Sequence, residues 1–176
     1  YFHLLRRQIK QNFQKPLVIM TPKSMLRLPE AKSPKENFIS CKFEELLDDE
    51  IIQNKNVIKK FILTSGKVFY DLAKYRIKNK IEDTAIIRIE QFYPFNKTKL
   101  NEILKSYPNT EKVIWLQEEP KNMGAWNFLN VRIKELLSEK QKLLCVSRPE
   151  GASPAVGSGK LSNQQQVNLI KQAFSV

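Results

Sequence analysis

Cysteine and histidine are scarce in this chain, and their scarcity excludes several kinds of site. Among 176 residues there are two cysteines and one histidine. Cys41 and Cys145 lie far apart and form no C-x-x-C pair. With His3 as the single histidine, the set of about four ligands that zinc requires cannot be assembled. We therefore expect no metal site. Cys145 lies within the apolar run KLLCVS, which predicts a buried, reduced core cysteine.

Glycine is also rare, with five in the whole chain. The stretch RPEGASPAVGSGK, residues 148–160, has the look of a phosphate-binding loop, but Pro154 stands where that motif needs glycine and Leu161 where it needs serine or threonine. No G-x-G-x-x-G follows the first strand of the regular region, where Gly66 is the one glycine. Gly66 and Lys67 open a helix that could hold an anion, although a simple tight turn is the favoured interpretation.

No apolar run approaches the roughly 18 residues that a membrane span needs, and no signal peptide is visible. The formal charge of +12 raises the hypothesis of an acidic partner such as nucleic acid. The basic residues are scattered, however, and acidic pairs interrupt them, as at Glu44–Glu45, Asp48–Asp49 and Glu118–Glu119. A solvated basic surface is the favoured interpretation, with neither nucleic acid nor membrane as partner.

No complete catalytic constellation is present. Glu118 and Glu119 are adjacent at a strand end, so their side chains point in opposite directions and cannot act on one atom. His3 lies beside the apolar residues Phe2 and Leu4 of an expected helix, and the sequence shows no base or nucleophile that could act with it. This favours a packing role for His3. We predict no catalytic residue in the chain.

The chain begins with a helical apolar stripe over residues 1–13, followed by KPLVIMTP, residues 15–22, a short run typical of a buried strand. Residues 21–40 carry three prolines and read as a surface linker. From residue 61 onward, short apolar runs alternate with amphipathic stretches. The expected strands are 61–65, 84–92, 112–119 and 142–149, and the expected helices are 66–79, 96–107, 122–139 and 162–175.

This alternation predicts an α/β fold with a mostly parallel sheet and helices on both faces, a three-layer αβα domain. In such sheets ligands bind outside the carboxyl ends of the strands. Those ends are polar here, and they include Lys67, Glu118 and Arg148.

Six blocks of sequence carry a resemblance that spans nearly the whole chain: YFHLLRRQ, KPLVIMTPKSMLR, SGKVFYDL, IIRIEQFYPF, WLQEEPKNMGAW and RPEGASPAVG. In this order they resemble the carboxyl-terminal region of the thiamine diphosphate-dependent first, decarboxylating component of 2-oxoglutarate dehydrogenase. The resemblance implies that residues 1–28 end a pyrimidine-binding domain as a helix and strand. Residues 29–55 would be a linker, and residues 56–176 a Rossmann-like carboxyl-terminal domain of the transketolase type.

The resemblance also implies an activity for the parent enzyme. That family decarboxylates 2-oxoglutarate with thiamine diphosphate and magnesium and succinylates the lipoyl group of the next component in the citric acid cycle. Its catalytic and cofactor-binding residues would lie upstream of Tyr1, so this fragment alone is expected to be inactive. The implied partners are a second copy, in a homodimer, and the lipoyl-bearing succinyltransferase. The abundance of Lys, Asn and Ile favours a bacterial, cytoplasmic protein over one of the mitochondrial matrix.

In some members of the family, effectors such as acetyl-CoA or AMP bind near this domain, and the resemblance implies the same possibility here. Candidate phosphate contacts are the basic residues at or beside the strand ends and the domain junction, namely Lys23, Arg27, Lys67, Arg88 and Arg148. A stand-alone regulatory module that binds acyl-CoA or a nucleotide is the alternative. The loop 148–160 would form a shaped surface at a domain or subunit junction, with Ser162 or Asn163 capping the last helix.

Overall fold

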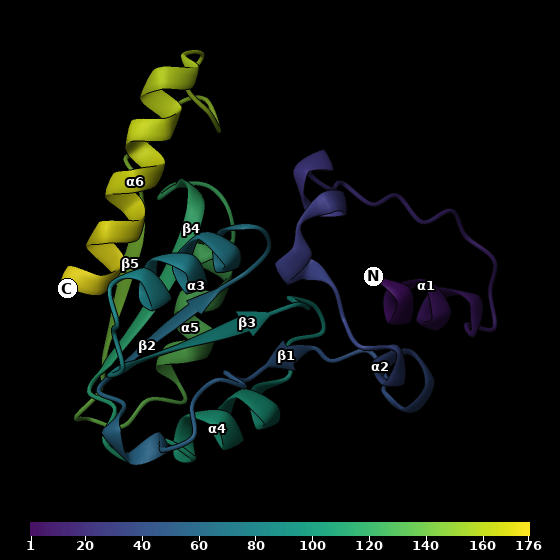
Figure 1. Ribbon diagram of the computed structural model, residues 1–176, viewed down its shortest axis with the longest axis horizontal. Helices are drawn as coiled ribbons and strands as arrows, with labels where there is room; N and C mark the ends of the chain where they lie inside the picture. The colour runs from purple at the N-terminus through teal and green to yellow at the C-terminus, as the bar shows by residue number, and fades with distance from the viewer. The chain divides into compact units, whose positions relative to one another are not determined.

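The computed structural model describes residues 1–176 (Figure 1). The chain divides into two compact units, Tyr1–Glu45 and Leu46–Val176. No helix in either is long and apolar enough to cross a lipid bilayer.

The first unit is built from short helical segments and has no buried residue. An edge-on contact between the rings of Phe2 and Phe38 joins its two α-helices, with the ring centroids 5.2 Å apart. His3 Nε2 lies 2.6 Å from the carbonyl oxygen of Asn37, which agrees with the packing role expected for this histidine. The elements are α1 (Phe2–Ile9), η1 (Lys23–Arg27), η2 (Pro29–Ala31) and α2 (Lys35–Ser40).

The strand expected over residues 15–22 is not formed. A strand needs a neighbour to satisfy its backbone N–H and C=O groups, and the first unit contains no other strand with which it could pair. Val18 and Met20 are accordingly exposed. The apolar pattern predicted a buried strand here, and this prediction is wrong because the pairing that makes a strand is not a local property.

The second unit contains a five-stranded sheet in the order β1-β3-β2-β4-β5. All neighbouring strands are parallel except β1, which pairs antiparallel with β3. The strands are β1 (Leu46–Leu47), β2 (Lys60–Thr64), β3 (Thr84–Ile89), β4 (Lys112–Pro120) and β5 (Lys142–Arg148). The helical segments are η3 (Lys55–Val57), α3 (Val68–Lys78), α4 (Lys97–Lys105), α5 (Trp126–Lys134) and α6 (Gly159–Ser175).

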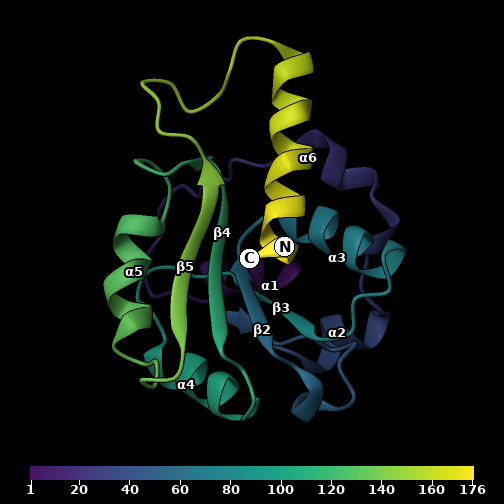
Figure 2. The same cartoon turned by 90° about the vertical axis from the view of Figure 1, so that its left-hand side faces the viewer.

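Helices cover both faces of the sheet (Figure 2). One face packs Phe61, Val113 and Trp115 against α4 and α5. The other packs Ile62 and Ile114 against α3 and α6. Successive strand residues point to opposite faces, so a strand buried on both sides is apolar over most of its length. Every residue of β2 is buried, and its three central residues are apolar. The predicted three-layer αβα, Rossmann-like fold is confirmed.

The order in which the chain adds strands to the sheet reverses at β2. The connection through α3 leads from β2 to β3 on one side, and the connection through α4 then leads to β4 on the other side of β2. Because parallel crossovers are right-handed, this reversal places α3 and α4 on opposite faces. The carboxyl ends of β2 and β4 therefore border the crevice where sheets of this type bind ligands.

Two expectations about the second unit need correction. The last helix begins at Gly159, and its cap is Ser158, whose side chain accepts a hydrogen bond from the Leu161 N–H at 3.4 Å; Ser162 and Asn163 lie inside the helix. Ser158 can cap a helix as well as Ser162 can, and the amphipathic pattern alone placed the start of the helix too late.

The sheet unit also includes residues 46–55, which the sequence analysis placed in the linker. Leu46 pairs with Ile89 and is buried in the core. Asp49 is buried as well, although its acidic pair was read as part of a solvated surface. Its carboxylate accepts hydrogen bonds from the Arg76 guanidinium and from the Ile86 N–H, which offset the cost of burying its charge.

Candidate functional site

Lys67 and Glu118 face each other across the crevice between β2 and β4. Lys67 follows Gly66, whose φ of +73° lies in the left-handed region that glycine adopts without strain. This turn ends β2 and starts α3, and it brings the Lys67 ammonium to 3.8 Å from the Glu118 carboxylate. Both side chains are partly exposed, so the attraction between them is weak and salt-sensitive.

Gln166, on α6, connects the groups at these strand ends. Its Nε2 donates to Asp71 on α3 at 2.9 Å and to Glu118 at the end of β4 at 2.8 Å. Its Oε1 accepts a hydrogen bond from Arg148 Nη2 at 3.2 Å. Two carboxylates and the cations Lys67 and Arg148 thus meet around one amide, and the charges of this strand-end network balance.

Arg88, at the end of β3, belongs to a separate cluster. Its guanidinium carbon lies 4.4 Å from the centroid of the Phe69 ring, a cation–π contact. Its Nε lies 3.6 Å from the Glu90 carboxylate. The guanidinium is therefore stacked and paired but still partly exposed.

The five basic residues predicted to contact effectors are distributed over both units. Lys67 and Arg148 share the strand-end network, and Arg88 lies at the end of β3 in the same sheet. Lys23 and Arg27 are the first and last residues of η1, in the first unit. The structure thus brings two of the five into one network.

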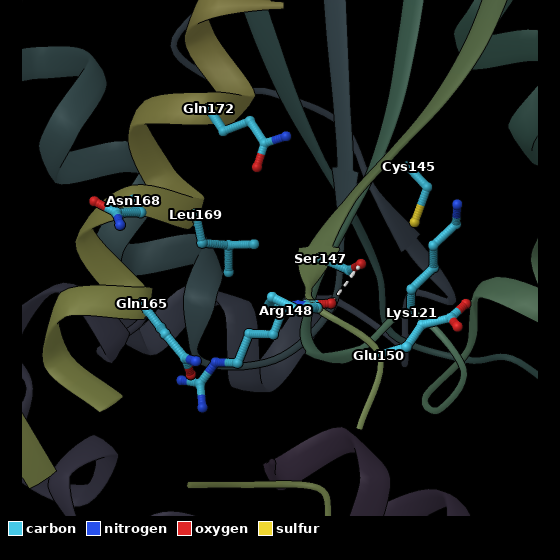
Figure 3. A pocket seen from close by; sticks show the side chains of 10 residues that line it. Lys121, Cys145, Ser147, Arg148, Glu150, Gln165, Asn168, Leu169 and Gln172 are labelled. Carbon is cyan, nitrogen blue, oxygen red and sulfur yellow. Dashed lines mark hydrogen bonds between the residues drawn. The ribbon is translucent and has the colours of Figure 1, made fainter. Parts of the chain in front are cut away.

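A cavity of about 430 Å³ lies beside this network, between β5 and α6 (Figure 3). We call it the β5–α6 cavity. Cys145, Ser147 and Arg148 of β5 form one wall, and α6 forms the opposite wall with three amide side chains and one leucine. The turn after β4 contributes Lys121, and the segment after β5 contributes Glu150. The α6 wall consists of Gln165, Asn168, Leu169 and Gln172.

Hydrogen bonds hold the turn after β4 against the loop after β5. The Lys121 N–H donates to the Arg148 carbonyl oxygen at 3.1 Å. Asn122 Nδ2 donates to the Gly151 carbonyl oxygen at 3.0 Å, and Asn122 Oδ1 accepts from the Gly151 N–H at 3.2 Å. The loop 148–160 lacks the sequence of a phosphate-binding loop. Its first residues instead form part of the rim of this cavity.

Cys145 is half-buried rather than fully buried, since it lines this cavity. Burial raises the pKa of its thiol, and the hydrogen bond to Ser147 and the charge of Lys121 offset this only in part. A raised pKa keeps the thiol protonated and weakly nucleophilic. The cavity is thus not built around a reactive cysteine.

Gln117 organises the turn after β4, although it is not among the residues predicted from the sequence. Its buried side chain accepts hydrogen bonds from the Trp115 indole N–H at 2.8 Å and the Trp126 backbone N–H at 3.0 Å. Its Nε2 donates to the Met123 carbonyl oxygen at 2.7 Å. A Cβ at Gly124, where φ is +67°, would lie 3.0 Å from this amide. A polar residue directly after the apolar run VIWL was the available signal.

The chain contains no group of three or more His, Cys, Asp or Glu side chains that could hold a metal ion. The strand ends carry a network of balanced charges beside a polar cavity. Fold and site together define a Rossmann-like αβα domain that places polar groups at the carboxyl edge of its sheet.

Comparison with known proteins identifies the family. The model of the family described as "2-oxoglutarate dehydrogenase C-terminal" matches residues 32–174. The chain belongs to this family. It is 46% identical over 174 residues to the "2-oxoglutarate dehydrogenase E1 component" of Cupriavidus necator, which covers 99% of this chain and 18% of that protein.

Two further relatives agree. The E1 component of Rickettsia typhi is 46% identical over 177 residues, covering 98% of this chain and 19% of that protein. The "2-oxoglutarate dehydrogenase E1/E2 component" of Corynebacterium glutamicum is 40% identical over 175 residues, covering 99% of this chain and 14% of that protein. The chain thus spans less than a fifth of the length of these relatives.

The family implies thiamine diphosphate and magnesium, and the residues of this chain do not fit that pair. Magnesium needs oxygen ligands in octahedral arrangement, with carboxylates among them. Asp71 and Glu118 do approach each other through Gln166, but Lys67 and Arg148 already balance their charges. No step of a thiamine-dependent reaction can be derived from these side chains.

Proposed function

We propose that this chain is the carboxyl-terminal part of a 2-oxoglutarate dehydrogenase E1 enzyme. The whole enzyme would decarboxylate 2-oxoglutarate with thiamine diphosphate and magnesium and pass the succinyl group to the lipoyl group of the next component. One observation carries the proposal: 98–99% of the chain aligns, at 46% identity, with two proteins that are named as E1 components.

Within that enzyme the chain would serve in assembly and regulation rather than in catalysis. The balanced charges around Gln166 support this role. Residues 1–28 would complete the pyrimidine-binding domain, residues 29–45 would form the connection, and the sheet unit from Leu46 onward would be the carboxyl-terminal domain. The enzyme would be a homodimer in the bacterial cytoplasm and would act with a lipoyl-bearing succinyltransferase.

The five basic residues would contact the phosphates of an effector such as acetyl-CoA or AMP. Partly exposed cations at the carboxyl edge of the sheet, Lys67 and Arg88, support this hypothesis. In the parent enzyme, Arg27→Ala and Arg148→Ala should each weaken the change in activity that AMP or acetyl-CoA causes. Arg132→Ala, on α5 and away from the strand ends, is the matched control. An unchanged response in both test variants would remove these residues from the effector site.

The activity itself is tested on the full gene product. We would measure 2-oxoglutarate-dependent reduction of an artificial electron acceptor, with thiamine diphosphate and magnesium, and run the 176-residue chain alongside. We expect activity in the full product and none in the chain. An inactive full product, with this and other 2-oxoacids, would contradict the proposal and favour the stand-alone binding module, for which calorimetry with acetyl-CoA and AMP is the direct assay.

A further inference from the structure

The two edges of the sheet differ in how they are protected. At one edge, β1 has two residues and pairs antiparallel with β3. At the other edge, β5 has seven residues, and β4 is its one neighbour. Between its terminal cations β5 carries no charged residue and no proline, although edge strands are usually short or protected by such residues. β5 is therefore an open edge that can accept another strand.

Alternate residues of β5 direct their backbone groups away from the sheet. The Lys142 N–H donates to the carbonyl oxygen of Glu111, just before β4, at 2.9 Å, so the even-numbered residues of β5 turn toward β4. This direction alternates from residue to residue. The odd-numbered residues, which are partly exposed, therefore turn their N–H and C=O groups to the open edge; they are Leu143, Cys145 and Ser147. Figure 2 views the sheet from this edge, with β5 in front and α5 and α6 on its two sides.

The β5–α6 cavity continues this edge. Cys145 packs with the core on the α4 and α5 face of the sheet, whereas Leu169 packs with the core on the α3 and α6 face. Both side chains line the cavity (Figure 3). A single space that touches both faces lies at the margin of the sheet, and here that margin is the carboxyl end of its last strand.

The α6 wall of the cavity offers hydrogen-bonding groups that suit a peptide backbone. Asn168 and Gln172 are exposed amides on this wall. Asn168 Oδ1 accepts from Gln164 at 3.1 Å, which leaves its Nδ2 as a donor, and the Gln172 amide carries both a donor and an acceptor. The open backbone groups of β5 and these amides together match an extended peptide.

The charge around the open edge favours an acidic partner. Residues 121–176 include β5 and its flanking helices α5 and α6, and they contain eight lysines and arginines but three glutamates, a net charge of +5. Lys142 starts β5, and Lys121 lines the cavity at the other end of the strand. Both side chains are exposed, and neither forms an ion pair within the chain. Acidic side chains on an added strand would complement them.

A second copy of this chain is a less suitable occupant of the edge. In an antiparallel pair of two β5 strands centred on Cys145, Lys142 of each copy would lie opposite Arg148 of the other. Like charges directly opposite each other destabilise a strand pair, and the positive charge of both regions would be brought together.

We propose that the open edge of β5 binds an extended, acidic segment of a partner protein as a sixth strand of the sheet. The outward N–H and C=O groups of β5 pair with the backbone of that segment, and its acidic side chains lie near Lys121 and Lys142. The cavity receives one of its side chains beside α6. In this mode of recognition the main-chain hydrogen bonds give affinity, and pockets for alternate side chains give specificity. The inference concerns an interaction surface and does not depend on the proposed enzyme activity.

The test is amide hydrogen exchange of the ¹⁵N-labelled 176-residue chain, measured by NMR with and without the peptide acetyl-EVTVTVE-amide. In the free chain the outward N–H groups of Leu143, Cys145 and Ser147 should exchange rapidly, whereas those of Leu144 and Val146 are protected by β4. At a peptide concentration about ten times the dissociation constant, exchange of the three outward groups should slow about tenfold. Protection of alternate residues identifies strand pairing.

Two control peptides separate backbone pairing from charge. Acetyl-EVTPPVE-amide has the same charge, but its two adjacent prolines remove an N–H donor from each edge of the peptide; it should give no protection. Acetyl-KVTVTVK-amide keeps the backbone donors and carries the opposite charge. It should bind several-fold more weakly than the acidic peptide, and the difference should grow as the salt concentration falls.

Variants of the chain locate the pairing. Ser147→Pro removes one outward N–H, a change that an edge strand tolerates, and should weaken binding of the acidic peptide by up to about tenfold. Ser147→Ala also loses the hydroxyl but keeps the N–H, and should bind normally. Lys142→Gln should weaken binding of the acidic peptide, whereas Lys105→Gln, on α4, is the matched control. Well-dispersed spectra establish that each variant is folded.

Four outcomes would overturn the proposal. Unchanged exchange at the highest peptide concentration would show that the edge accepts no strand. Equal protection by the proline peptide would reduce the binding to charge attraction. Equal or tighter binding of the lysine peptide would contradict the acidic chemistry of the partner. Protection that grows with protein concentration in the absence of peptide, together with a dimer in sedimentation equilibrium, would assign the edge to a second copy.

Discussion

Removal of the Asp49 carboxylate should strongly destabilise the sheet unit. Asp49 and Arg76 form a buried ion pair in which the side chains are 4% and 5% exposed. Arg76 Nη2 donates to Asp49 Oδ1 at 3.2 Å, and the Ile86 N–H donates to Oδ2 at 2.8 Å. Asp49→Ala leaves a buried guanidinium without its counter-charge and a strand N–H without its acceptor.

The magnitude follows from this geometry. Loss of one partner from a buried pair costs about 3–5 kcal/mol. Removal of both charges in Asp49→Ala/Arg76→Met leaves mainly the unsatisfied Ile86 N–H, which costs about 1–3 kcal/mol. The double variant should therefore be more stable than Asp49→Ala alone.

Urea unfolding of the 176-residue chain, followed by the fluorescence of the buried Trp115, measures these differences. With a slope of about 2 kcal/mol per molar urea, a loss of about 4 kcal/mol lowers the midpoint by about 2 M. The exposed pair Lys97–Glu135 is the matched control, and Lys97→Met should cost at most about 1 kcal/mol. A double variant that loses the sum of the two single losses would refute the reasoning, because the two charges would then act independently.

Three further predictions concern single residues. Gly66→Ala should cost about 1–2 kcal/mol for its left-handed backbone, and Gly124→Ala more, because its added Cβ would also lie 3.0 Å from a side-chain amide; thermal unfolding of the two variants compares them. Ellman's reagent should modify the exposed Cys41 several-fold faster than Cys145, since burial raises the pKa of the Cys145 thiol; equal rates would contradict that burial. Burial and the hydrogen bond to a carboxylate raise the pKa of Tyr107, so the folded state holds this proton more tightly than the unfolded one, and stability falls as pH rises above about 10, the ordinary tyrosine value. Tyr107→Phe should lose stability at neutral pH but show a shallower decline above pH 10 in urea titrations.

Several of the site residues could be predicted from the sequence because strand ends are local features. Lys67, Arg88 and Arg148 each stand where an apolar run stops, and in a parallel sheet such positions share one edge. The sequence did not reveal that Lys67 and Arg148 join one network. That network depends on Gln166, which comes from a helix 18 residues beyond Arg148 and 95 beyond Asp71.

The amino-acid sequence by itself determined the α/β class, the four parallel strands with their following helices, and the family. The spacing of apolar residues along the chain is a local property, and strands buried on both faces are apolar over most of their length. The tertiary structure alone decided which polar residues are buried and with what partners. Asp49 is indistinguishable from Asp48 in the sequence, yet it becomes a core residue because folding brings Arg76 and the Ile86 N–H against it. Residues 15–22 have the composition of a strand but form none, because a strand exists only through the hydrogen bonds of a neighbour.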